Sequence, residues 1–153
     1  MKRHTLPPRL RDFDYSLSMT YFVTFCVQNR RRVFIDPALA AISRDELKRF
    51  REKGWFWLYT FAIMPDHIHI LLRLPDESRT LGRVVATLKS SIQFKCRRRG
   101  VDLQWQDNFY DHVVRRNEQT EEIAGYILRN PERAGLVKPG EAYPFAAMLD
   151  QYL

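Results

Sequence analysis

The sequence lacks any apolar run long enough to cross a membrane, and the basic N-terminal stretch "MKRHTLPPRLRDFD" has no apolar segment behind it. A membrane span needs about 20 mostly apolar residues, so we expect neither a membrane protein nor a secretion signal. Cysteine is scarce: Cys26 and Cys96 are the two present, and no CxxC occurs. We therefore expect free, buried or partly buried thiols in a reducing cytoplasm. Repeats and low-complexity segments are also missing, and 153 residues suit a single domain over 1–153.

Basic residues, by contrast, are in excess. Lysine and arginine number 25 against 18 acidic residues, which gives a net charge of +7. This favours a polyanionic partner, nucleic acid before an anionic membrane surface. For any single residue a solvated surface charge is about as probable a role as DNA binding, but as a set the clusters suit phosphate contacts. The candidate DNA-binding residues are Arg30, Arg31, Arg32, Lys95, Arg97, Arg98, Arg99, Arg115, Arg116 and Arg133.

The order of predicted elements indicates the fold class. Residues 1–18 read as an extended arm, because of two prolines and many charges. Apolar periodicity and capping residues then predict strands over 19–27, 55–64, 67–74 and 108–115, with helices starting at 37, 81 and 117 or 120. Pro131 is expected to stop or kink the last helix, and the tail after it is expected to be irregular. The order is that of an α+β, ferredoxin-like split βαβ fold, with an antiparallel sheet, helices on one side and a further C-terminal helix that carries a tyrosine.

Two of the four histidines lie in the predicted strand "HIHILLRL". Alternate residues of a strand share a face, so His67 and His69 point the same way and Ile68 and Ile70 point toward a core. This spacing lets both imidazoles reach one metal ion. Taken alone, the pattern is more often an ordinary pair of histidines.

The third helix offers further candidates. Tyr126 and Asn130 are one turn apart, and therefore on one helix face. An asparagine carbonyl oxygen suits Mg²⁺ or Mn²⁺, and a tyrosine oxygen attacks phosphorus when activated near a metal. The alternatives are a packing role for Tyr126 and a helix C-cap role for Asn130.

Three stretches, "MPDHIHILLRLP", "WQDNFYDHVVR" and "YILRNPERAGLV", together resemble the IS200-like single-tyrosine (Y1) transposases of the HUH endonuclease class. The resemblance is nearest to the REP-associated tyrosine transposase branch and extends from about Tyr21 to Val137. It implies that His67 and His69 bind a divalent metal, Mg²⁺ or Mn²⁺, with Asn130 as the third ligand. It also implies that Tyr126 is the catalytic nucleophile, and so gives His67, His69 and Tyr126 as the catalytic set.

The implied activity is cleavage and rejoining of single-stranded DNA at imperfect-palindrome hairpins, through a 5′-phosphotyrosine intermediate and a free 3′-hydroxyl. A bacterial, cytoplasmic and nucleoid-associated protein is implied, as a monomer in preference to a homodimer. The chain departs from the family pattern at Asp66, where asparagine is common, and at Glu132, where relatives often have an apolar residue. Asp66 orients an imidazole or is simply a turn residue, and the turn role is favoured.

Several alternatives stay open. Tyr110 is a rival nucleophile, although a packing or stacking role suits its strand better. Trp105 stacks on unpaired bases or packs in the core. At the level of function, the rivals are a hairpin-binding protein that has lost catalysis and a metal hydrolase of small phosphate esters. A rolling-circle replication initiator shares the histidine motif but needs a larger domain arrangement.

Overall fold

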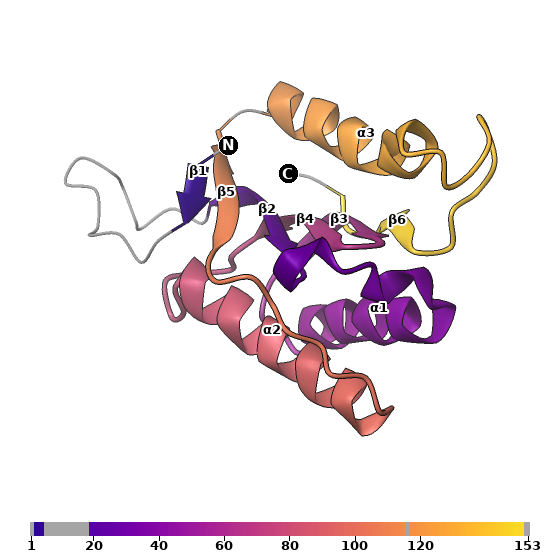
Figure 1. The fold of residues 1–153 in the computed structure, drawn as a ribbon. Coiled ribbons are helices and arrows are strands. Elements are labelled where there is room, and N and C mark those ends of the chain that lie inside the picture. The colour runs from indigo at the N-terminus through magenta and orange to yellow at the C-terminus, as the bar shows by residue number, and fades with distance from the viewer. Residues whose placement is uncertain (1, 5–18, 116, 152–153) are drawn as a thin grey trace.

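The computed structural model describes residues 2–4, 19–115 and 117–151, which form one six-stranded sheet between two layers of helix (Figure 1). Helices α1 and α2 cover one face of the sheet, and α3 lies across the other. The strand order is β1-β5-β2-β4-β3-β6, and every neighbouring pair is antiparallel. The strands are β1 Lys2–His4, β2 Thr20–Cys26, β3 Trp57–Met64, β4 His67–Arg73, β5 Phe109–Val114 and β6 Ala146–Met148. The helices are α1 Pro37–Glu52, α2 Leu81–Arg98 and α3 Asn117–Arg133, with short 3₁₀ turns η1 Gln28–Arg30 and η2 Val33–Ile35.

The four inner strands, in the order β5-β2-β4-β3, reproduce the predicted split βαβ arrangement, so the predicted fold class is confirmed. The two outermost strands were not predicted. β1 lies in the segment assigned to an extended arm, and β6 lies in the tail assigned to irregular structure. Each has three residues, too few for an alternating pattern to stand out, and each is a strand because a longer neighbour supplies its hydrogen bonds. The rest of the predicted arm, residues 5–18, lies outside the described residues.

Local signals set the helix ends. Asp36 caps α1 by accepting a 2.9 Å hydrogen bond from the Ala38 N–H, and Pro37 occupies the first helical position. Thr80 caps α2 in the same way, through the Arg83 N–H at 3.1 Å. The prediction that Pro131 stops α3 was wrong, because the helix continues to Arg133, while the alternative of a kink stays a prediction. A proline this close to the C-terminus interferes with one main-chain hydrogen bond and leaves the last turn in place.

Apolar side chains are buried on both faces of the sheet. On the α1 and α2 side, the large core includes Val23, Phe25, Ile68, Ile70 and Leu72. On the α3 side, a smaller core joins Phe22, Tyr59, Met64 and Leu71 to Ala124 and Ile127 of α3. The smaller core holds α3 against β3 and β4. It thereby brings Tyr126 of α3 close to His69 of β4.

The two cysteines are free and buried, as predicted. In the described part of the chain, no helix is both long and apolar enough to cross a membrane.

Candidate metal and DNA-cleavage site

Strand register places the two predicted histidines in adjacent rows of the sheet. His67 pairs with Cys26 of β2 and Met64 of β3, and His69 pairs with Thr24 and Ala62. Both side chains lie on the α3 face, as the alternating pattern predicted. His69 is nevertheless buried, at 6% exposure, because Phe22 of the smaller core packs against its ring.

The two imidazoles meet through their outer nitrogens. Nε2 of His67 lies 3.2 Å from Nε2 of His69, and the rings are nearly perpendicular, at 78°. Two nitrogen ligands of one ion, each about 2.0–2.1 Å from it and separated by 90–109°, lie about 2.9–3.4 Å apart. The pair therefore already has the spacing of two ligands of a single metal ion.

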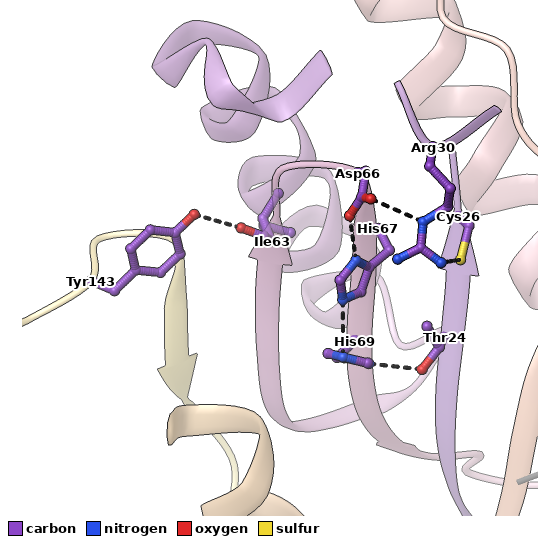
Figure 2. A network of polar contacts seen from close by, with 8 residues as sticks. All are labelled: Thr24, Cys26, Arg30, Ile63, Asp66, His67, His69 and Tyr143. Atoms are coloured by element: carbon purple, nitrogen blue, oxygen red, sulfur yellow. Dashed lines mark hydrogen bonds and ion pairs between the residues drawn. The ribbon is translucent and has the colours of Figure 1, made fainter. Parts of the chain in front are cut away.

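The inner nitrogens of both rings are held by oxygen atoms (Figure 2). Nδ1 of His67 lies 2.6 Å from a carboxylate oxygen of Asp66, and Nδ1 of His69 lies 2.7 Å from Oγ1 of Thr24. Such partners fix ring orientation and tautomer in metal sites, and leave Nε2 to face the ion. Asp66 is thus more than the turn residue that the sequence favoured, although it does lie in the β3–β4 turn. Sequence reasoning did not find Thr24, since its contact with His69 depends on the register of β2 against β4.

The electrostatics of the pair favour neutral imidazoles. Burial, together with the smaller effect of the positive charges of His67, Arg133 and Arg30, lowers the pKa of His69 to about 3. Burial also lowers the pKa of His67, although Asp66 opposes that effect. For Asp66, burial alone would raise the pKa, but hydrogen bonds from Arg30 and His67 outweigh it and the pKa lies below the usual value. Neutral imidazole is the form that binds metals, so neither ring has to lose its charge first.

Helix α3 brings Tyr126 next to the histidines. The rings of Tyr126 and His69 have centroids 6.3 Å apart, and Phe22 packs against both. Tyr126 is 46% exposed, so its ring borders the site and also faces solvent. The guanidinium of Arg133 lies 4.1 Å from the centre of that ring. The site thus combines a neutral histidine pair, an accessible phenol and a nearby cation.

A third ligand is needed to complete a metal site. Among the described residues, no group of three His, Cys, Asp or Glu side chains could hold an ion. Asn130, the expected third ligand, is half-buried and lies one turn beyond Tyr126 on α3. Its amide oxygen and water molecules are donors that suit Mg²⁺ or Mn²⁺ beside two imidazoles. The residues present therefore fit a divalent cation whose coordination is only partly supplied by protein.

The comparison with known families agrees with this geometry. The model of the family described as "Transposase IS200 like" matches residues 15–130, about three quarters of the chain. The chain belongs to the IS200-like transposase family. The predicted family resemblance is thereby confirmed.

Two relatives of this chain are named as REP-associated tyrosine transposases, one of them provisionally. The chain is 24% identical to the REP-associated tyrosine transposase of Escherichia coli K12, over 83% of this chain and 74% of that protein. It is 26% identical to a Haemophilus influenzae protein provisionally named as a REP-associated tyrosine transposase, over 88% of this chain and 82% of that one. A solved REP-associated tyrosine transposase, bound to a REP hairpin, has the same fold: the TM-score is 0.72 at 23% identity, over 92% of this chain and 82% of that one.

The basic residues of this chain are not equally placed around the site. Arg30 and Arg133 lie close enough to lower the pKa of His69. Arg31 and Arg97 instead contact Asp102, through its carbonyl and its carboxylate respectively. The other six are distributed as follows: Arg32 is exposed and precedes η2, Lys95 pairs with Glu46, Arg98 lies over Phe94, Arg99 follows α2, Arg115 follows β5, and Arg116 lies outside the described residues. DNA binding by these residues stays a prediction.

The remaining aromatic candidates are also placed. Trp105 packs against Phe25 and Phe34, and its indole N–H donates a 2.9 Å hydrogen bond to the Lys89 carbonyl. This supports the packing role over base stacking. Tyr110 lies on β5 opposite Thr24, one strand further from β4 than Thr24 itself. Tyr126, by contrast, makes a ring contact with His69, and the choice of nucleophile between the two tyrosines stays a prediction.

Proposed function

We propose that this chain is a metal-dependent endonuclease and strand transferase of single-stranded DNA, acting at REP-like hairpins through a 5′-phosphotyrosine intermediate. The observation that carries the proposal is the 3.2 Å Nε2–Nε2 pair of His67 and His69 beside the half-exposed ring of Tyr126. Family membership gives the reaction class, and hairpin DNA is proposed as partner because a transposase of the same fold is bound to a REP hairpin.

In the proposed reaction, the Tyr126 oxygen attacks the scissile phosphorus in line with the 3′-oxygen. The bond from phosphorus to that oxygen breaks, and a bond from the phenol oxygen to the 5′-phosphate forms. The phenol loses its proton and the departing 3′-oxygen gains one, so no water is consumed and rejoining is the same step in reverse. A bound Mg²⁺ or Mn²⁺ would polarise the phosphate and offset its developing negative charge.

Each neighbouring residue has a part in this step. His67 and His69, with Asn130, would hold the ion, while Asp66 and Thr24 orient the two rings. Arg133 adds positive charge where the phosphate must approach Tyr126. The ring contact of Tyr126 with His69 of the same chain supports a tyrosine that acts in its own site, and a monomer is proposed on that basis.

The test is a cleavage assay with labelled single-stranded hairpins, including palindromes from around the gene, in Mg²⁺ or Mn²⁺. A metal-dependent protein–DNA adduct that survives denaturation is expected for the unaltered protein and for Tyr110→Phe. Tyr126→Phe and His67→Ala should give no adduct.

Two results would contradict the proposal. Hairpin binding with no adduct in either metal would favour a binding protein without catalytic activity. An adduct that persists in Tyr126→Phe and disappears in Tyr110→Phe would assign the nucleophile to Tyr110.

A further inference from the structure

The carboxylate of Asp66 joins His67 to a residue far away in the sequence. One of its oxygens lies 2.6 Å from Nδ1 of His67, and the other accepts a 2.9 Å hydrogen bond from Nε of Arg30 (Figure 2). Nη1 of Arg30 also lies 3.6 Å from Sγ of Cys26, the strand partner of His67. The arginine therefore binds both the acceptor that orients His67 and the strand beside it.

The main chain around this contact is fixed from both sides. The carbonyl of Asp66 accepts a 2.9 Å hydrogen bond from the Val27 N–H, and that of Pro65 accepts one from the Phe34 N–H, also at 2.9 Å. These bonds attach the β3–β4 turn to both ends of the segment that contains η1. Within η1, Asn29 and Arg30 have φ angles of 57° and 54°, in the left-handed region that non-glycine residues seldom occupy. That backbone directs the Arg30 side chain toward Asp66, and two consecutive residues in this region persist only where surrounding contacts hold them.

We propose that Arg30 and Asp66 are positioning residues that set the divalent-metal affinity of His67 and His69. The inference rests on the proposed function, because it presumes that these histidines bind a metal. Arg30 fixes the Asp66 carboxylate, and Asp66 fixes the His67 ring so that Nε2 points at the shared site. Arg30 is 56% exposed, and an ion pair so exposed contributes little to folding stability. Its effect is therefore expected in metal affinity more than in stability.

Binding of Mn²⁺ without DNA tests this role, measured by the loss of the free-ion electron paramagnetic resonance signal. Arg30→Ala should weaken binding about tenfold or more, the size expected when an outer partner of a ligand is lost. The matched control is Arg83→Ala, which removes an exposed arginine of α2 on the other face of the sheet and should bind Mn²⁺ like the unaltered protein. Arg30→Lys, which keeps the charge and a donor, should recover most of the affinity even if Arg30→Ala folds poorly.

A double-mutant comparison separates positioning from a direct charge effect. In an Asp66→Asn background, Arg30→Ala should cause little further loss, because the charged acceptor through which Arg30 acts is gone. Equal losses in both backgrounds, or no loss in either, would overturn the inference. The failure of the proposed function looks different: Mn²⁺ binding that is absent, or that His67→Ala leaves intact, would mean that the histidines are not the metal site at all.

Discussion

The guanidinium of Arg133 lies 4.1 Å from the centre of the Tyr126 ring and donates a 2.6 Å hydrogen bond to the Tyr126 carbonyl. One side chain thus contacts both the ring and the main chain of the proposed nucleophile. Since Tyr126 is half-exposed, this contact restricts a ring that solvent would otherwise leave mobile. The position of the tyrosine is therefore set by the last turn of α3 as well as by the smaller core.

Loss of this contact should slow cleavage. A cation–ring contact contributes about 0.5–2 kcal/mol, so Arg133→Ala is expected to reduce the rate of adduct formation about tenfold. The measurement is the single-turnover rate of adduct formation at saturating hairpin DNA. Arg129→Ala is the matched control, since it removes an exposed arginine from the same helix. A rate in Arg133→Ala equal to that of Arg129→Ala would remove Arg133 from the mechanism.

The Thr24 hydroxyl should matter for metal binding because it is the described partner of Nδ1 of His69. Thr24 is buried, and valine keeps its shape while removing the oxygen. Thr24→Val is expected to weaken Mn²⁺ binding about tenfold, within the range for lost partners of ligating histidines. Thr24→Ser keeps the hydroxyl and should retain near-normal affinity. Identical affinities for the serine and valine variants would show that the hydroxyl does not orient His69.

The buried carboxylate of Glu46 should make the fold sensitive to acid. Glu46 is 1% exposed, and Arg49, Ser91 and Lys95 all donate hydrogen bonds to it, which joins α1 to α2. Burial would raise the pKa of Glu46, but those donors outweigh it and lower the pKa from 4.5 to about 2. Because the folded-state value is the lower one, the stabilisation is complete above about pH 4.5 and is lost as the pH falls toward 2.

The ionised Glu46 side chain stabilises the fold by on the order of 3 kcal/mol. This follows from the difference between the unfolded-state and folded-state pKa values, at about 1.36 kcal/mol for each unit of pKa. Urea unfolding at pH 7 and pH 3 should therefore show a steep loss of unfolding free energy in the unaltered protein. Glu46→Gln should be less stable at pH 7 and should show a shallower loss between the two pH values. Asp45→Asn, next to it on the exposed side of α1, should behave like the unaltered protein. A pH dependence of Glu46→Gln as steep as the original would assign the acid sensitivity to other carboxylates.

Much of the site could be predicted because local patterns decided it. Alternation over residues 67–74 placed His67 and His69 on one face, and helical spacing placed Tyr126 and Asn130 on one face of α3. Capping by Asp36 and Thr80 marked two helix starts correctly. Each of these features depends on residues that lie within one helical turn or one strand of each other. A short stretch of sequence therefore contains all the information needed to predict them.

Other features depend on partners far away in the chain. For Lys95, a predicted DNA-binding residue, only the structure shows that its ammonium pairs with Glu46 on a different helix. The strands β1 and β6 exist because longer strands supply their hydrogen bonds, and the extent of α3 past Pro131 depends on where in the helix the proline falls. The local propensities of the residues do not predict any of these three features.

By itself, the sequence determined the order of the inner strands and helices, the orientation of the histidine pair, and the family. Hydrophobic periodicity and motif spacing are properties of neighbouring residues and survive without tertiary contacts. Only the tertiary structure decided which oxygens hold the two imidazoles and that Arg30 reaches Asp66. The contacts of Thr24 with His69 and of Arg30 with Asp66 span 45 and 36 residues, and they are fixed by strand register and by the turn at η1.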